Sequence, residues 1–310
     1  MSSRLEIRPL QEELLDDASA LLAERHARHR AVEPLLPQAG GARRHLEAAL
    51  AREGASGAAA IAGGQLVGYL VGAPVGERRI EVGLAGHAAA EPEVARDLYA
   101  ALAQDWVDAG LVHHAVYVPA HDAALVDAWF RLAFGLQFAF AVREVAAEPQ
   151  FDAGVTIRPG RPDEVEAAAA LERSLWEHQV GSPSFSGAEV PSLSTFVEDW
   201  ASGTWDDPAF AHFVAERDGD LVGQALMYVR PTGDLRIPER AVDLAQVETL
   251  PDMRGSGVGR ALFAHVMSWA NAQGYAAMTT DWRSVNLLAS RFWTRRGFRP
   301  TFLRLYRSVP

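Results

Sequence analysis

The sequence contains no cysteine and no lysine, and each absence removes a class of chemistry. Without cysteine the chain has no disulfides, no thiolate nucleophile and no zinc site built on sulfur, which suits the cytosol. Without lysine it lacks the residue that a P-loop needs after its last glycine. The 29 basic residues are all arginines, and with 40 acidic residues the net charge is −11, which argues against binding to nucleic acid.

Long hydrophobic runs are also missing. The most apolar stretch, residues 123–142, is interrupted by Asp127 and Arg131 and is better interpreted as a helix followed by a strand than as a membrane span. The first eight residues lack the apolar centre of a signal peptide. We therefore expect a cytoplasmic protein that does not contact membranes. At 310 residues, 49% of them hydrophobic, the chain has room for two well-filled domains.

Residues 241–274 combine a strand, a glycine-rich loop and a helix. The run of apolar residues that stops before Pro251 predicts the strand. Apolar residues at helical spacing over 260–273, with Gly274 just past the last of them, predict the helix. Between them, Gly255, Gly257 and Gly259 follow Arg254. Glycines let backbone N–H groups approach a ligand without a Cβ in the way, and the positive end of the helix points to the same place. This loop is suited to binding an anion, most plausibly a phosphate.

A dinucleotide-binding fingerprint fits the loop poorly. Its third glycine falls on Leu262 or on Arg260, depending on where the pattern starts. Asp281 follows the next predicted strand at a distance typical of that fold, so a dinucleotide-dependent oxidoreductase stays a third alternative.

The loop resembles the acyl-CoA motif of the GNAT superfamily of N-acetyltransferases, [Gln/Arg]-x-x-Gly-x-[Gly/Ala]. Residues 254–259 match it in full, and the resemblance continues downstream through Asn286, Ala289, Phe292, Trp293, Gly297 and Phe298. Asp243 is similar in position to an acidic residue that is common in the strand before the loop. The match covers residues 155–310, about one domain.

One pattern of elements occurs twice along the chain. Residues 155–159 repeat residues 5–9, each followed by an acidic helix, and two glycine-turn hairpins follow at 59–68 and 213–223. The seam is a polar stretch with proline and glycine. We therefore expect an α/β fold of two tandem GNAT domains, with boundaries 1–145 for the first domain, 146–154 for the linker and 155–310 for the second domain.

The first copy has lost the phosphate loop. At the positions of Arg254, Gly257 and Gly259 it carries Ala90, Glu93 and Ala95, with Pro92 beside them. A glutamate repels phosphate and proline lacks an N–H donor. The first domain is predicted to be a degenerate, structural partner that binds no CoA.

The resemblance implies an N-acetyltransferase that uses acetyl-CoA as co-substrate and transfers its acetyl group to an amine by direct attack. It also implies a cofactor site. Its residues are Val247, Glu248 and Thr249 along the pantetheine arm, Arg254, Gly255, Ser256, Gly257, Val258, Gly259 and Arg260 around the pyrophosphate, and Asn286 and Trp293 on the following helix.

The attacking amine must lose a proton, so a base is needed. Asp243 and Glu248 are the candidates, although regular alternation puts them on opposite faces of their strand unless a bulge intervenes. Trp293 stands where many family members have a tyrosine that protonates the departing thiolate, and an indole is no useful acid. Either the thiolate leaves without that acid, or water, Tyr306 or Ser290 replaces it, and a non-catalytic CoA-binding or regulatory protein is the main alternative.

In this fold the first two helices of a domain wall the acceptor pocket. Here they offer residues 176–186, with His178 as a weak candidate base, followed by Trp200 and Trp205. Such aromatics with carboxylates suit an amine on a small molecule or a peptide, and a monomer or homodimer is expected. The histidine pairs 26/29 and 113/114 have no third ligand nearby, so no metal site is predicted.

Overall fold

The computed structural model describes residues 4–310 except 188, 203–204, 206 and 232. It divides into two compact units, one made of residues up to 140 together with 300–310, the other of residues 141–299. Among the described helices, none is both long and apolar enough to cross a membrane.

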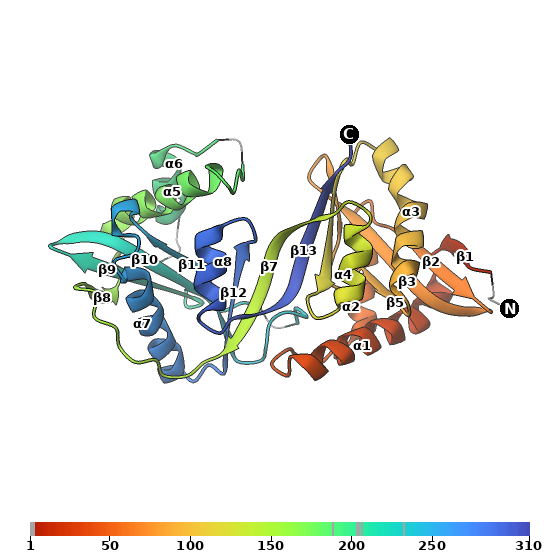
Figure 1. Ribbon diagram of the computed structural model, residues 1–310, viewed down its shortest axis with the longest axis horizontal. Coiled ribbons are helices and arrows are strands. Elements are labelled where there is room, and N and C mark those ends of the chain that lie inside the picture. The colour runs from red at the N-terminus through yellow and green to blue at the C-terminus, as the bar shows by residue number, and fades with distance from the viewer. Residues whose placement is uncertain (1–3, 188, 203–204, 206, 232) are drawn as a thin grey trace. The chain divides into compact units, whose positions relative to one another are not determined.

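The first unit is a mixed sheet with helices packed against it (Figure 1). Its strands run in the order β1-β2-β3-β4-β6-β13, with β5 on β3, and only β4 and β6 are parallel. Its core lies under α3 and includes Leu98, Trp106, Trp129 and Phe134. The elements are β1 Glu6–Pro9, η1 Glu12–Leu14, α1 Leu15–Val32, α2 Ala42–Leu50, β2 Ser56–Ala62, β3 Gln65–Val75, β4 Arg79–Val82, β5 His87–Ala89, α3 Pro92–Asp108, β6 His113–Pro119, α4 Ala123–Phe130 and β13 Arg299–Ser308, with the start of β7 Gly135–Glu144.

The second unit is built in the same way. Its strands run in the order β8-β9-β10-β11-β12, antiparallel except for β11 and β12. Helices α5 and α7 both pack on β10 and β11, from opposite faces (Figure 1). The elements are β8 Thr156–Pro159, η2 Pro162–Glu164, α5 Val165–Val180, α6 Leu193–Ala201, β9 Phe210–Arg217, β10 Asp220–Tyr228, β11 Ala241–Thr249, η4 Pro251–Met253, α7 Val258–Ala272, β12 Ala277–Arg283 and α8 Leu287–Thr294.

The predicted elements and the repeat are present, but the expected domain boundary needs correction at the C-terminus. Strand β13 pairs antiparallel with β6 over Phe302–Ser308, and Leu305 lies in the core of the first unit. Residues 300–310, expected in the second domain, therefore belong with the first unit. Residues 141–144 at the end of β7 are counted with the second unit instead. Strand membership depends on pairing across the sheet, which the order of elements in a sequence does not specify.

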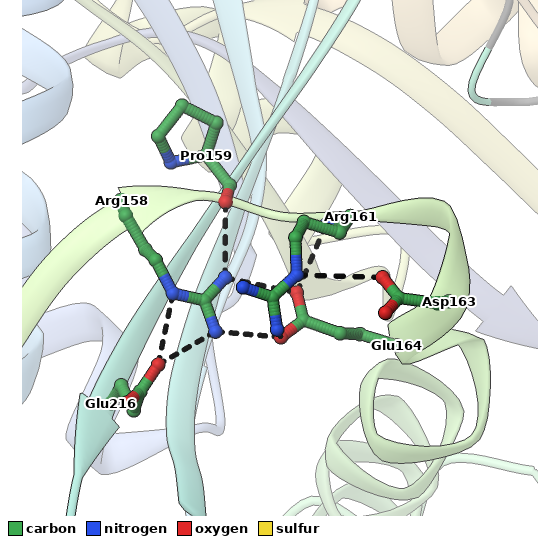
Figure 2. Close-up of polar contacts among 6 residues, drawn as sticks. All are labelled: Arg158, Pro159, Arg161, Asp163, Glu164 and Glu216. Carbon is green, nitrogen blue, oxygen red and sulfur yellow. Dashed lines mark hydrogen bonds and ion pairs between the residues drawn. The ribbon is translucent and has the colours of Figure 1, made fainter. Parts of the chain in front are cut away.

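A charged cluster at the start of the second unit ties β8 to β9 and to the start of the first helix (Figure 2). Arg158 contacts Glu216 through Nε and Nη2 (2.9 and 2.7 Å) and Glu164 through Nη1 and Nη2 (3.0 and 2.6 Å). Glu164 also accepts the backbone N–H of Arg161 at 2.9 Å. The two carboxylates, Glu164 first, raise the pKa of Arg158, so the guanidinium stays charged where it is largely enclosed.

Replacing Arg158 by methionine is expected to lower the free energy of unfolding by about 2 kcal/mol, because it leaves two neighbouring carboxylates without their shared cation. The denaturant midpoint of the full chain measures this. Arg161→Met is the matched control, since its side chain is 56% exposed and its ion pairs are worth under about 1 kcal/mol. Equal midpoints for the two variants would show that the cluster does not stabilise the fold.

Candidate active site

Strand β11 contains a bulge that brings both predicted acids to one face. Its pairing with β10 runs Leu226↔Gln246 and then Met227↔Leu244, so one extra residue is inserted on β11. Opposite residues of an antiparallel pair share a face. Glu248 lies opposite Gln224, and Asp243 lies opposite Tyr228. Gln224 contacts α5, and Tyr228 packs on the cluster formed with α5 and α6, so both acids face that side of the sheet.

Glu248 is a buried carboxyl with one oxygen in use. Its side chain is 5% exposed, and Oε1 accepts a hydrogen bond from Gln224 Nε2 at 2.5 Å. Its Oε2 has no partner among the described residues. Burial raises the pKa of Glu248 to about 8, the Gln224 bond opposes the rise and the charge of Glu172 adds to it. A carboxyl of this kind exchanges a proton near neutral pH, as a general base must.

Gln224 and His212 hold Glu248 in place. The amide nitrogen of Gln224 also donates to the carbonyl of Ala168 on α5 (3.1 Å). Its oxygen then faces His212, whose Nε2 lies 2.9 Å away and donates to it. Burial lowers the pKa of His212 to about 4, so the ring is neutral and fixes the orientation of the amide. Neither residue belongs to a sequence motif, although a glutamine in an otherwise apolar strand was a signal.

Asp243, the second candidate base, is occupied by partners. Thr279 Oγ1 donates to Oδ1 at 2.7 Å, and the Arg230 guanidinium forms an ion pair with Oδ2 at 2.7 Å. The side chain joins β11 to β12 and to the segment after β10. This arrangement gives Asp243 a clear structural role and leaves Glu248 as the acid with a free oxygen.

Strands β11 and β12 separate on the way to the glycine loop. Their parallel pairing covers Ala241–Asp243 with Ala277–Thr279, and Thr280 Oγ1 then bonds to the carbonyl of Leu244. In the described register no β12 residue pairs with the stretch from Val247 to Thr249. The backbone of this stretch is therefore a polar edge next to Glu248, which is what an extended, amide-bearing ligand requires.

The loop after β11 has the geometry of an anion cradle. Gly255 and Gly257 have φ values of +82° and +97°, which glycine adopts without strain, and Gly257 caps α7. The first bond inside α7 runs from Ala261 N to Gly257 O (3.0 Å), so the N–H groups of residues 258–260 precede the bonded turns. A Cβ at Gly259 meets nothing closer than 3.6 Å, and Arg254, Gly255 and Ser256 are exposed.

The stretch predicted to be a simple linker contacts this loop. A Cβ at Gly257 would lie 2.5 Å from Phe151 Cε1, and the guanidinium of Arg260 stacks on the same ring, 4.0 Å from its centroid. Arg217 holds the segment by donating to the carbonyl of Gly154 at 3.2 Å. Gly257 is therefore constrained by its own fold as well as by any ligand.

Positive charge accumulates near the loop. Arg296, just past α8, stacks on Phe292 with its guanidinium carbon 3.4 Å from the ring centroid. The pKa of Arg296 is lowered to about 10, mainly by burial and then by the charge of Arg260, while Glu148 opposes the shift and Arg295 adds to it. Arginines gathered beside the start of α7 favour an anionic ligand there.

Two of the predicted cofactor residues lie on α8, and both have structural contacts within the protein. Asn286 caps the helix, its side-chain oxygen accepting from Leu288 N (3.2 Å) and Ala289 N (3.1 Å). Trp293 is 6% exposed and packs edge-to-face on Phe263, Phe292 and Phe298. Tyr306, a weak substitute for the missing acid, belongs to the first unit, where its phenol bonds to His113 (2.9 Å). Ser290 bonds to the carbonyl of Leu287.

The aromatic residues predicted to line the acceptor pocket pack over the face of the sheet that carries Asp243 and Glu248. Trp200 packs on Trp205 (5.6 Å between centroids) and Trp176 on Phe196 (5.9 Å). His178 lies at the end of α5, half-buried.

In the first unit His26 bonds to the carbonyl of Pro37 and His29 stacks on His121. Within the described residues no group of three or more His, Asp or Glu side chains is arranged for a metal ion.

Comparison with known proteins places this site in a family. Residues 173–298 match the acetyltransferase (GNAT) family. A mycothiol acetyltransferase of Streptomyces griseus is 28% identical over 153 residues, 49% of this chain but only 45% of that protein, so the chain spans less than half of that relative.

Several solved structures match nearly the whole chain, and two of them illustrate the similar fold. A GCN5-related N-acetyltransferase from Sphaerobacter thermophilus has a TM-score of 0.61 at 13% identity, covering 98% of this chain and 95% of the other. A tandem GNAT protein from the clavulanic acid biosynthesis pathway has a TM-score of 0.52 at 15% identity, covering 98% of both. The chain thus has the fold of a tandem GNAT protein, and its residues 173–298 match the GNAT acetyltransferase family.

Proposed function

We propose that the second unit is an N-acetyltransferase that binds one acetyl-CoA along β11, the glycine loop and α7, and uses Glu248 as its base. The observation that carries the proposal is the position of Glu248, a buried carboxyl with an unpaired oxygen and a pKa raised to about 8, on the same strand that ends in the loop. GNAT-fold acetyltransferases use acyl-CoA, and the polar edge of the strand, the glycine loop and the start of the helix support the proposal.

Each predicted cofactor residue has a place in this proposal. The N–H groups of residues 255–260 would hold the pyrophosphate, with Arg254 and Arg260 supplying positive charge at the rim. The edge from Val247 to Thr249 would bond to the pantetheine amides. Asn286 and Trp293 would act indirectly, by fixing α8 beside the loop.

The proposed reaction needs one proton acceptor. The amine nitrogen forms a bond to the acyl carbon as the carbon–sulfur bond breaks, and Glu248 Oε2 takes a proton from the nitrogen. The thiolate leaves and is protonated from water, because Trp293 offers no acid in place of the usual tyrosine. Gln224 stays bonded to Oε1 and keeps the carboxylate oriented during the transfer.

The first unit is proposed to bind no CoA. Its α3 begins with Pro92, and Glu93 in the first turn forms an ion pair with Arg96 at 2.7 Å and contacts Arg131. A carboxylate thus lies where the second unit has its glycine loop, and it already complements the positive end of the helix.

Calorimetry with the full chain is expected to show one acetyl-CoA site per molecule and none for NAD. Release of free thiol in the presence of a panel of small amines and peptides then tests catalysis, with the chain lacking the amine as the background. Thiol release that follows the amine concentration supports the transferase.

Two results would overturn the proposal. Two acetyl-CoA sites per chain would contradict the account of the first unit. Tight acetyl-CoA binding without thiol release for any amine would favour a CoA-binding protein without catalytic activity.

A further inference from the structure

A second carboxylate lies near Glu248, and its hydrogen-bond donors among the described residues are all neutral. Glu172 on α5 accepts a hydrogen bond from Trp200 Nε1 at 2.7 Å and a longer one from Gln246 Nε2 at 3.4 Å. Nearby arginines have acids of their own, since Arg173 pairs with Glu177 and Arg230 pairs with Asp243. Within the described part of the chain, no ion pair neutralises Glu172.

Unused acceptors continue from Glu172 toward the base. Gln246 Oε1 and Glu248 Oε2 are both buried and have no hydrogen-bond partner among the described residues. These two side chains lie two positions apart, so they share a face and are about 7 Å apart along the strand. Glu172, Gln246 and Glu248 therefore present a row of oxygen atoms, with a carboxylate at each end. Buried acceptors without a donor are costly, which indicates that a donor-rich ligand completes them.

Aromatic side chains surround this row. Trp200 holds Glu172 and packs on Trp205, and Tyr228 lies in the same cluster of side chains. Trp176 on α5 is 38% exposed, although it packs edge-to-face on Phe196. The faces of such rings attract cations and exclude water.

We propose that Glu172 binds a second, non-reacting ammonium group of the acceptor, which makes a compact diamine the substrate class of this site. The inference rests on the acetyltransferase function proposed above. The reacting amine lies at Glu248 Oε2, and the distal ammonium forms an ion pair with Glu172 and donates a further hydrogen bond to the side-chain carbonyl of Gln246. The ion pair with Glu172 keeps one nitrogen protonated, and Glu248 removes the proton from the other. The nitrogen beside Glu248 is therefore the one that reacts.

The test compares 1,5-diaminopentane with 1-aminopentane, which has the same carbon chain and one ammonium group fewer. The full chain should acetylate the diamine with a kcat/KM about 10- to 100-fold higher. In Glu172→Gln this preference should fall to about threefold or less, mainly through KM for the diamine. Glutamine keeps the acceptor for Trp200 and removes only the charge. Glu166→Gln, an exposed position on the same helix, should retain the full preference.

Binding separates this inference from the proposed function. Calorimetry in the presence of CoA measures the affinity for 1,5-diaminopentane without any turnover, and Glu172→Gln should weaken it at least tenfold. If neither amine is acetylated but this loss is observed, the transferase is wrong and the diamine site stands. An unchanged diamine preference and affinity in Glu172→Gln, or no preference in the unaltered chain, would reject the diamine site.

Discussion

Glu248→Gln is expected to lower kcat/KM for acetyl transfer by about 10²- to 10⁴-fold and to make the protein more stable. The activity falls because glutamine cannot accept the proton of the attacking amine. The side chains have the same shape, and the oxygen of glutamine still accepts the hydrogen bond from Gln224 Nε2. The affinity for acetyl-CoA should therefore change little, and calorimetry checks that.

The gain in stability follows from the pKa of Glu248. Burial raises it to about 8, whereas the carboxyl titrates near its ordinary value when the chain is unfolded. The folded state thus binds more protons between these two values, so stability falls as the pH rises through that window. Glutamine removes this loss. Above pH 8 the variant should be more stable by a few kcal/mol, and below about pH 4 the two proteins should be equal, as measured by denaturant midpoints across pH.

The pH dependence of activity gives an independent test. With a weakly basic amine that is neutral throughout, kcat/KM should rise with pH to a plateau, with a midpoint near 8 set by Glu248. In Glu248→Gln the residual rate should lose that midpoint. A variant that is less stable and keeps its activity would show that Glu248 serves only the fold.

Local patterns were sufficient to predict the elements around the site. The strand 241–249, the glycine loop and the helix after it follow from apolar spacing and from the positions of glycine and proline. The repeat was visible because its strands, hairpin turns and helix ends recur in the same order. The loss of phosphate binding in the first copy stays a prediction from residue type alone, because glutamate and proline oppose phosphate binding whatever the fold around them.

Features that depend on pairing between distant segments could not be predicted in this way. The bulge at residue 245 exists only in the register with β10, so alternation alone put Asp243 and Glu248 on opposite faces. Phe151 looked like an ordinary linker residue, and its contact with Gly257 needs the folded chain. Strand β13 was assigned to the wrong unit because nothing in its sequence identifies β6 as its neighbour.

Gly259→Glu is expected to weaken acetyl-CoA binding by at least 100-fold, measured by calorimetry. The residue is the second of α7, where the N–H groups point toward the proposed pyrophosphate site. A carboxylate there repels the phosphates and competes for the same donors. The fold itself should not suffer. A Cβ at this position lies 3.6 Å or more from its neighbours, and an acidic residue in the first turn of a helix is favourable.

Gly259 is a better test site than Gly257, the position that corresponds to Glu93 in the first copy of the repeat. A side chain at Gly257 is strained by a φ of +97° and by Phe151, so loss of binding there would not separate a damaged loop from a blocked one. Gly259→Ala should bind acetyl-CoA within a few-fold of the unaltered chain, and Gly259→Gln separates size from charge. The unfolding midpoint of Gly259→Glu should equal or exceed that of the unaltered chain. Full affinity in that variant would mean that the loop does not hold the phosphates, and an equal loss in Gly259→Gln would mean that bulk, and not charge, excludes them.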